Sequence, residues 1–370
     1  MDTKKILIIE PFYGGSHKKL IDIICSNLPE NFYLLITMKA KKWHWRARAS
    51  ALYVSTQIPH DHSFEILFCT SVLPLAELLG LRPDLIRLKK LVYFHENQLE
   101  FPVRITKERD FQYGYNEILT CIVADKVLFN SYYNQDSFLS HINGHLNLQP
   151  DYRLKDLDQT IRPKCTVIYY PLDLYTIDYH LSSRDAICSS AGEETSDELH
   201  IVWPHRWEFD KNPEAFYKCL CKMDESGHMF KVSILGETFG KKMEVFNDLH
   251  ERLTTKLVNL GYVSSPAKYY GILKTADVVV STAIHEFFGV AVLEAVYCGC
   301  VPVVPNRLAY TELYGGRVEE IYETEEELYD ILVNLCKRKK NDDLNKDYRY
   351  LALPYDAKKW FDKMYEVFNS

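Results

Sequence analysis

Long apolar segments are absent from this chain of 370 residues. The first apolar run, residues 6–9, ends at Glu10, and no later stretch approaches the roughly 18 residues that cross a bilayer. A signal peptide also needs a longer apolar run than this one. We therefore expect a cytoplasmic chain, with the nucleus as a further location, that does not act at a membrane.

The sequence also lacks the cysteine spacing of a zinc site. Its 10 cysteines are scattered, and the close pairs Cys219/Cys221 and Cys298/Cys300 are separated by one residue instead of two. Reduced structural thiols are the expected state. An excess of positive charge is missing as well, because the formal net charge is −7. That charge argues against general coating of nucleic acid, although a local basic patch remains compatible with it.

What the chain does contain is a regular alternation of short apolar runs with segments of helical period. Continuous apolar strands separated by helices are typical of parallel sheets covered on both faces. The predicted strands are residues 5–9, 32–37, 64–69, 91–94, 126–130, 166–169, 200–203, 231–235, 256–260, 277–281 and 301–304. Two such series predict an α/β protein with two doubly wound, Rossmann-like domains whose parallel sheets face a central cleft.

The domain boundary is predicted from a polar, acidic stretch at residues 182–198. We expect an N-terminal domain over residues 1–175, a flexible linker over 176–198 and a C-terminal domain over 199–354. Apolar residues at helical spacing predict a last helix in residues 355–370 that packs across the domains. Ligands of parallel sheets bind beyond the carboxyl ends of the strands, so functional residues are expected directly after strands.

The first such cluster is HEFFGVAVLE, residues 285–294, which follows a predicted strand and opens a helix ending near residue 297. Glu286 and Glu294 are placed to face one site, where they suit sugar and ribose hydroxyls. The amides of Phe288, Gly289 and Val290 begin the helix and predict an anion site. The alternative is two solvated glutamates, but an apolar helix has little reason to carry Glu294 without a partner.

The second cluster is WPHRWEFDKNP, residues 203–213, after the strand at 200–203. Arg206 and Lys211 are two cations at a strand-to-helix junction, an arrangement that suits a diphosphate. They would also neutralise a leaving group without a metal ion. The alternative is a pair of surface cations.

Two further clusters follow strands of the first half. In EPFYGGSHK, residues 10–18, Gly14 and Gly15 let the backbone approach a ligand at a helix start, unless they only form a tight turn. In YFHENQLEFP, residues 93–102, His95 and Glu96, with Asn97 beside them, are candidates to face an acceptor. A histidine after a strand can also be purely structural.

A fifth cluster is basic and aromatic. The segment KAKKWHWRAR, residues 39–48, holds five cations, one histidine and two tryptophans, which suits phosphate contact and base stacking. The alternative is a solvated basic loop with both tryptophans packed inward. The residues expected to bind RNA are Lys41, Lys42, Trp43, His44, Trp45, Arg46 and Arg48. Further cations that could extend the patch are Arg82, Arg87, Lys89, Lys90, Arg104, Lys107 and Arg109.

One motif points to a metal. Asp156 and Asp158 spell D-x-D, which holds a divalent ion in metal-dependent glycosyltransferases. Here the motif lies in a polar segment and not after a strand, so we predict no metal site and no cofactor.

On these residues the chain resembles family GT4 of retaining glycosyltransferases with the GT-B fold. The E-x7-E spacing of Glu286 and Glu294 and the pair Arg206 and Lys211 carry that resemblance. The strings EPFYGGSHK, KKWHWRARASA, YFHENQLEFP and HRWEFDKNP resemble, within it, the tRNA-queuosine mannosyltransferase subfamily. The family's usual Asn-Gly-Val-Asp after the last N-domain strand is replaced here by YPLD, residues 170–173.

The resemblance implies GDP-mannose as donor and, as acceptor, the queuosine cyclopentenediol at the wobble position of tRNA-Asp. It implies that Glu286 contacts the donor sugar, Glu294 the ribose, and Arg206 and Lys211 the diphosphate. It places Gly14 and Gly15 near the phosphates and His95 at the sugar and acceptor. The residues expected to act in catalysis are His95, Glu286, Arg206 and Lys211. No carboxylate nucleophile is evident, so front-face transfer with retention is expected.

Two other functions remain open at this stage. A related transferase could act on a lipid or small-molecule acceptor, which would call for an amphipathic basic helix on the N-terminal domain. A non-catalytic RNA-binding protein could also use the same scaffold, although it would have no need for the Glu286/Glu294 and Arg206/Lys211 pairs.

Overall fold

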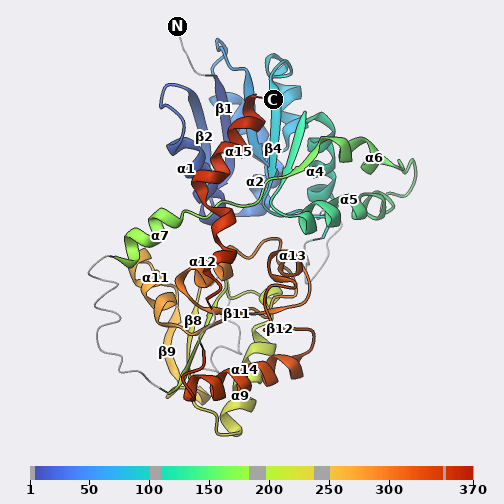
Figure 1. Cartoon of the computed structure of the whole chain (residues 1–370). Coiled ribbons are helices and arrows are strands. Elements are labelled where there is room, and N and C mark those ends of the chain that lie inside the picture. The colour runs from blue at the N-terminus through green and yellow to red at the C-terminus, as the bar shows by residue number, and fades with distance from the viewer. Residues whose placement is uncertain (1–4, 101–109, 183–196, 237–250, 345–346, 370) are drawn as a thin grey trace. The chain divides into compact units, whose positions relative to one another are not determined.

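The computed structural model describes residues 5–100, 110–182, 197–236, 251–344 and 347–369. The chain divides into two compact units. The first comprises Met1–Pro171 and Ala357–Ser370, and the second comprises Leu172–Asp356. Each unit contains one sheet of six strands (Figure 1).

All strands of the first sheet are parallel, in the order β2-β1-β3-β4-β5-β6. Their bounds are β1 Ile6–Tyr13, β2 Tyr33–Lys39, β3 Ile66–Thr70, β4 Lys89–Phe94, β5 Lys126–Phe129 and β6 Cys165–Val167. Central strands are buried on both faces; in β4, residues 91–94 are all fully buried. This double burial explains the near-continuous apolar runs from which the strands were predicted.

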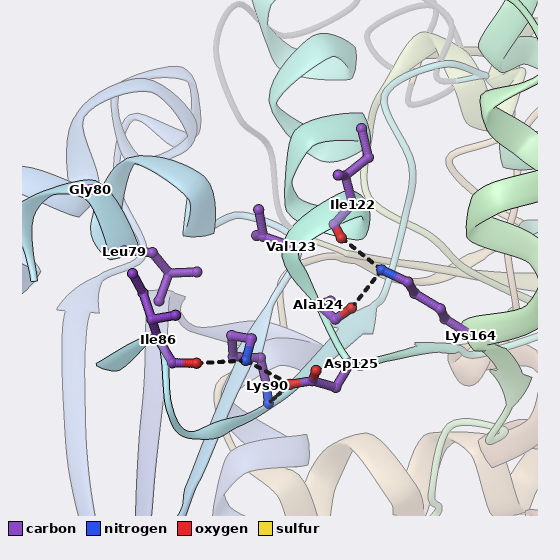
Figure 2. A pocket seen from close by; sticks show the side chains of 9 residues that line it. All are labelled: Leu79, Gly80, Ile86, Lys90, Ile122, Val123, Ala124, Asp125 and Lys164. Atoms are coloured by element: carbon purple, nitrogen blue, oxygen red, sulfur yellow. Dashed lines mark hydrogen bonds and ion pairs between the residues drawn. The ribbon is translucent and has the colours of Figure 1, made fainter. Parts of the chain in front are cut away.

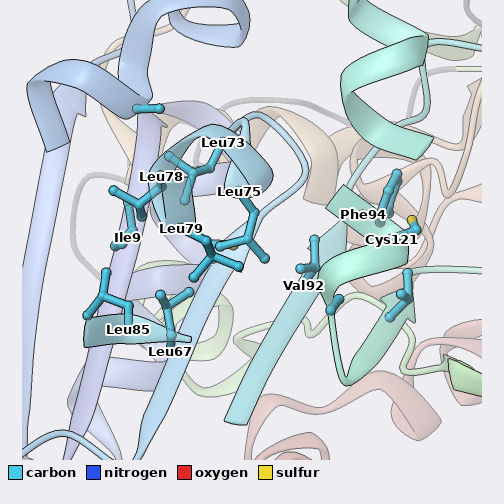
Figure 3. Close-up of a cluster of buried hydrophobic side chains, with 14 of the residues drawn as sticks. Ile9, Leu67, Leu73, Leu75, Leu78, Leu79, Leu85, Val92, Phe94 and Cys121 are labelled. Atoms are coloured by element: carbon cyan, nitrogen blue, oxygen red, sulfur yellow. The ribbon is translucent and has the colours of Figure 1, made fainter. Parts of the chain in front are cut away.

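The helices of the first unit cover both faces of its sheet. They are α1 Gly15–Ser26, α2 Trp43–Gln57, α3 Leu75–Leu81, α4 Phe111–Val123, α5 Tyr132–Leu146, α6 Leu157–Ile161 and α15 Ala357–Asn369. Leu75, Leu78 and Leu79 of α3 join Leu67 and Val92 of the sheet in one buried apolar cluster (Figure 3). This cluster fixes the strands, and so the loops that follow them.

The second sheet is also parallel, in the order β12-β11-β10-β7-β8-β9. Its strands are β7 Leu199–Pro204, β8 Phe230–Leu235, β9 Leu257–Gly261, β10 Val278–Val280, β11 Val301–Pro305 and β12 Ile321–Tyr322. Its helices are α7 Leu174–Leu181, α9 Pro213–Glu225, α11 Pro266–Thr275, α12 Val290–Cys298, α13 Ala309–Tyr314 and α14 Glu325–Lys340. The short strand β12 was not predicted.

Residues 172–181 differ from the predicted domain bounds, because they belong to the second unit. Residues 176–181, expected in a flexible linker, belong to α7, whose cap Asp173 accepts a hydrogen bond from the amide of Thr176 at 3.0 Å. His180 of α7 stacks on Tyr270 of α11, so α7 is part of the second unit. Residues 183–196 of the expected linker lie outside the described residues.

The last helix, α15, belongs to the first unit. Its buried face is formed by Trp360, Met364 and Phe368, one turn apart. The indole of Trp360 donates to the carbonyl of Tyr169 at 2.6 Å, which ties α15 to the chain just after β6. None of the described helices has the length and apolarity that a bilayer crossing requires.

Candidate active site

In the second unit, the loops after β7 and β10 are bonded to each other because the two strands are neighbours in the sheet. The indole of Trp203 donates to Thr282 Oγ1 at 3.1 Å, and that hydroxyl donates to the carbonyl of Lys211 at 2.8 Å. The amide of Ile284 donates to the carbonyl of Asp210 at 2.9 Å. The sheet therefore brings together the two clusters in which Lys211 and Glu286 were predicted.

Lys211 lies at the centre of this region, with its side chain 8% exposed. Its ammonium donates to the carbonyl of His285 at 2.9 Å and to Glu286 Oε2 at 3.1 Å. It also forms an ion pair with Asp210 Oδ2 at 3.1 Å. Sequence reasoning identified Lys211 and Glu286 but missed the buried Asp210, whose position beside Lys211 in the chain was the only signal.

The charges of this cluster stabilise one another. Burial alone would lower the pKa of Lys211, but the carboxylates of Glu286 and Asp210 outweigh it and raise that pKa. Burial alone would raise the pKa of Glu286, but the ammonium of Lys211 lowers it to about 2. The cation and the acid are therefore both charged at neutral pH.

Arg206 and His205 precede this cluster in the same loop. The guanidinium of Arg206 is half exposed and lies 3.6 Å from Glu208 Oε2, and its charge opposes the rise in the pKa of Lys211. His205 is buried, and burial, with the nearby charge of Lys211, lowers its pKa to about 3. A neutral imidazole and an accessible guanidinium thus lie beside Lys211.

The start of α12 fits the prediction in part. Gly289 has φ of 84°, and a Cβ there would lie 2.8 Å from the Tyr310 ring, so only glycine suits the position. The amide of Phe288 is directed to Glu286 Oε1 at 3.4 Å and so is not unpaired as predicted. The amides of Gly289 and Val290 have no acceptor within the described parts of the chain.

Glu294 lies in the second turn of α12 and is 6% exposed. Its Oε1 accepts a hydrogen bond from the hydroxyl of Tyr270 at 3.2 Å, and its Oε2 faces the hydroxyl of Tyr269 at 3.4 Å. Both tyrosines come from α11. The partner that the apolar helix required is therefore a tyrosine pair, which sequence reasoning missed although the two residues are adjacent in the chain.

In the first unit, Gly14 and Gly15 connect β1 to α1. A Cβ on Gly14 would lie 2.4 Å from the Cβ of Ala40, so the close approach is to β2 and its following residue. Gly15 has φ of 54°, which favours glycine, and open space where its Cβ would be. Gly14 therefore serves packing, and Gly15 is the position open to a ligand.

His95 follows β4 and is 6% exposed. Its ring lies 3.9 Å from the ring of His17, which is bonded to Glu10 and faces Glu96. Burial lowers the pKa of His95 well below its usual range, and the charge of His17 adds to this effect. His95 Nε2 is buried and has no hydrogen-bond partner within the described ranges.

Asn97 was predicted to face the acceptor, and the structure contradicts this. Its side chain is fully buried. Its amide donates to Asn134 Oδ1 at 2.9 Å and to Ser137 Oγ at 3.0 Å, while its own oxygen accepts from the amide of Glu100 at 2.9 Å. Asn97 therefore fixes the loop that carries His95 and Glu96.

The basic segment forms the end of β2 and the first turns of α2, not an irregular loop. Trp45 is 57% exposed, whereas Trp43 is half-buried and packs on Tyr113. Arg48 lies over the same ring at 4.6 Å. Lys41, Lys42 and His44 are exposed, and Arg46 and Arg48 are partly exposed. One tryptophan and most of the cations are thus available at the surface.

Three cations proposed to extend this patch have structural roles instead. Arg82 is buried and bonded to Asp84 and to backbone carbonyls. Lys89 donates to the carbonyl of Val367 in α15 at 2.6 Å, and Lys90 to that of Leu88 at 2.6 Å. The candidates Arg104, Lys107 and Arg109 lie outside the described residues.

Comparison with known proteins shows the family to which the chain belongs. Residues 5–172 match the family described as tRNA-queuosine alpha-mannosyltransferase N-terminal, and residues 189–319 match glycosyl transferases group 1. The tRNA-queuosine alpha-mannosyltransferase of Drosophila melanogaster is 45% identical over 370 residues, which cover 98% of this chain and 96% of that protein. This chain belongs to the tRNA-queuosine alpha-mannosyltransferase family.

The other matches are more distant. A GDP-mannose-dependent phosphatidylinositol dimannoside mannosyltransferase of Mycobacterium tuberculosis is 28% identical over 124 residues, 32% of this chain and 30% of that protein. The crystal structure of Anabaena HepE with UDP and glucose superposes with a TM-score of 0.68 at 14% identity and covers 99% of both chains. Sucrose-phosphate synthase of Thermosynechococcus elongatus gives 0.70 at 12% identity, covering 99% of this chain and 98% of that one. The family member therefore has the two-domain glycosyltransferase (GT-B) fold.

The first unit also contains a cavity of about 440 Å³, which none of the predicted catalytic or donor-binding residues lines (Figure 2). Lys90, Asp125 and Lys164 line it, and each lies at or just before the start of a strand, at the amino edge of the sheet. Lys164 donates to the carbonyls of Ile122 and Ala124, where it caps the end of α4. Lys164 therefore satisfies the end of α4, and Lys90 pairs with Asp125 at 2.7 Å.

Proposed function

We propose that this chain transfers mannose from GDP-mannose, with retention, to the cyclopentenediol of queuosine at the wobble position of tRNA-Asp. Membership of the tRNA-queuosine alpha-mannosyltransferase family supports the acceptor and the sugar. The observation that carries the proposal is the contact between Lys211 and Glu286 beside the start of α12, with Arg206 on the same loop. A tRNA substrate also supports a cytoplasmic location.

The donor would be held by charge and by free amides. Arg206 is exposed enough to bind a diphosphate bidentately, and the amides of Gly289 and Val290 offer two more donors to an anion. Lys211 already uses its ammonium on Asp210, Glu286 and a carbonyl. We expect a bound diphosphate to take over one of these contacts.

The two glutamates would bind the sugar and the ribose of the donor. Glu286 retains acceptor capacity for sugar hydroxyls because each of its oxygens has a single partner. Glu294 would bind the two ribose hydroxyls while Tyr269 and Tyr270 fix its orientation. Both carboxylates are therefore oriented before the donor arrives.

Transfer would proceed on the front face of the sugar. The bond from the sugar's anomeric carbon to the diphosphate breaks and its electron pair leaves with the phosphate oxygen. The acceptor oxygen bonds to that carbon from the same side, and its proton passes to the departing phosphate. Arg206 and Lys211 would stabilise the charge that develops on the leaving group, which makes a metal ion unnecessary.

The acceptor RNA would meet the basic helix α2. Lys41 and Lys42 are exposed for phosphate contact, and the exposed ring of Trp45 suits stacking on a base. His95, with an unpartnered buried nitrogen within the described ranges, would receive a sugar or acceptor hydroxyl.

The test is mass analysis of tRNA nucleosides after incubation with the purified protein and a panel of nucleotide-sugars. Mannosyl-queuosine formed from GDP-mannose, and not from other donors, is the expected product. A different hexose on queuosine would refute the donor. Sugar on a phosphatidylinositol lipid, with none on tRNA, would refute the acceptor, and an activity abolished by EDTA would refute metal independence.

A further inference from the structure

Glu10 and His17 form a buried charged pair to which the proposed reaction gives no role. Glu10 lies in β1 and is fully buried, and His17 lies in the first turn of α1 and is 4% exposed. The turn at Gly14 and Gly15 brings the two side chains together at the carboxyl edge of the first sheet. A fully buried carboxylate is costly to maintain, so its retention calls for a reason.

Both ring nitrogens of His17 face carboxylates. Nδ1 lies 3.1 Å from Glu10 Oε2, and Nε2 lies 3.7 Å from Glu96 Oε2. The other oxygen of Glu10 accepts a hydrogen bond from the amide of Phe12 at 2.7 Å. One face of the His17 ring lies 3.9 Å from the His95 ring, tilted by 32°. His17 thus touches His95 and Glu96, two of the three residues predicted to face the acceptor.

The charges support this geometry. Burial alone would lower the pKa of His17, but Glu10, and then Glu96, outweigh it and raise that pKa to about 10. His17 is therefore an imidazolium at neutral pH, and its charge helps to keep His95 neutral. Tyr93 and Tyr170 flank His95, and burial raises the pKa of the Tyr93 hydroxyl well above its usual range.

We propose that Glu10 and His17 are positioning residues for the acceptor half of the site, where they hold the Glu96 carboxylate and the His95 ring against an incoming hydroxyl. This proposal rests on the proposed transferase function. The Nε2 of His95, which has no hydrogen-bond partner within the described ranges, supports a ligand there, because a buried nitrogen without a partner is unfavourable and a hydroxyl would satisfy it. Glu10 and His17 themselves touch no substrate.

A metal ion is the rival interpretation of the same cluster. Single ligand atoms of Glu10, His17 and His95 lie within 4.8 Å of one another, the only such trio among the described residues. However, a metal needs a lone pair on His17, and both of its nitrogens are directed at carboxylates. The facing rings of His17 and His95 also favour a charged ring on a neutral one over two imidazoles that point to a common ion.

The experiment compares Glu10→Gln and His17→Gln with wild-type protein in queuosine-tRNA mannosylation across a range of pH. The matched control is His62→Gln, because the buried side chain of His62 also contacts a carboxylate, that of the exposed Asp84 at 3.0 Å, before β3 at the opposite edge of the sheet. Histidine protonation is followed by NMR of protein labelled in its histidine rings. Melting temperatures of all variants identify any that do not fold.

The two variants should differ in their response to acid. In Glu10→Gln the pKa of His17 falls, so kcat should drop about tenfold above about pH 7 and recover as acid restores the imidazolium. His17→Gln should lose a similar factor at every pH, and both variants should keep the KM for GDP-mannose within about twofold. The control should match wild-type protein throughout. In NMR, His17 should stay protonated to near pH 10 only while Glu10 is present.

Three results would overturn the proposal. They are an unchanged pH profile in Glu10→Gln, a wild-type His17 that loses its proton near neutrality, or a zinc-dependent activity that both variants abolish. If wild-type protein transfers no sugar while the His17 resonance behaves as expected, the transferase function fails and the geometry of the ion pair stands.

Discussion

Replacing Lys211 with methionine should separate stability from donor chemistry in the second unit. The substitution keeps the length of the side chain but removes the ammonium that faces Asp210 and Glu286. Both carboxylates are at least four-fifths buried, with exposed side-chain fractions of 2% and 20%. Two acids would then lie next to each other without a cation between them.

The expected loss of stability is about 3–5 kcal/mol, which is typical when one partner of a buried ion pair is removed. The pKa of Glu286 gives a similar figure. Its fall from an ordinary 4.5 to about 2 corresponds to about 3 kcal/mol of stability. Because the folded pKa is depressed, that contribution is present above pH 4.5 and is lost as the pH falls towards about 2.

The variant should show the opposite dependence on pH. Without Lys211, burial raises the pKa of Glu286, so acid neutralises the carboxylate and relieves the destabilisation. Calorimetric melting should therefore show a large deficit at neutral pH that shrinks as the pH is lowered to about 5. Turnover should stay low at every pH, because the diphosphate has lost one of its two cations.

The control is Lys339→Met, which removes a partly exposed partner 2.8 Å from Asp277 in the same unit. It should cost less than about 1 kcal/mol and leave turnover unchanged. Adding Asp210→Asn to Lys211→Met should restore part of the stability and none of the activity. If Lys211→Met melts like wild-type protein at neutral pH, the mutual stabilisation argued for this cluster is wrong.

Two further predictions concern the substrates. Replacing Tyr269 and Tyr270 together with phenylalanine should raise the KM for GDP-mannose about tenfold with little change in kcat, because Glu294 loses its orienting hydroxyls; a fall in kcat at constant KM would contradict this. Replacing Lys41 and Lys42 with glutamine should weaken tRNA binding and reduce its dependence on salt, measured by fluorescence anisotropy, while hydrolysis of the donor continues; an unchanged salt dependence would place the RNA elsewhere.

The sequence predicted the sheets well because buried parallel strands produce continuous apolar runs. It failed for β12, whose two residues give no pattern, and for α7. The start signal of α7 was present in Asp173, with the apolar residues Leu174 and Ile177 behind it, but the acidic stretch that follows suggested a linker. The prediction followed the acidic composition of the stretch and not the helix start at Asp173, and the structure shows that the helix start was the better guide.

The site was predicted where residue type decides the chemistry and was missed where tertiary contact decides it. Lys211 and Glu286 were found because a cation and an acid after strands have few structural uses. Asn97 follows a strand equally closely, yet sequence alone cannot tell a ligand from an organiser of the loop. Glu10 and His17 were not predicted as a pair. They are seven residues apart, and the sequence does not indicate that the intervening turn brings their side chains into contact.

At the carboxyl edge of each sheet a buried cation lies between two acids. In the first sheet His17 lies between Glu10 and Glu96, and in the second Lys211 lies between Asp210 and Glu286. Such groups are expensive: buried ion pairs can often be replaced by apolar residues without loss, and sometimes with a gain of about 1–4 kcal/mol. A fold selected only for stability would therefore have little use for Asp210, Lys211 and Glu286 in this arrangement. Under the proposed function, these charges would already be oriented when the diphosphate arrives, so that little reorganisation is needed as the bond breaks.

We therefore expect a triple variant, Asp210→Leu, Lys211→Met and Glu286→Leu, to melt at or above the wild-type temperature while failing to bind GDP in calorimetry. Asp210→Leu alone, which leaves Lys211 paired with Glu286, should melt lower than the triple variant. If the triple variant is the least stable of the set, the charges hold the two loops together, and the argument that they are kept for chemistry fails.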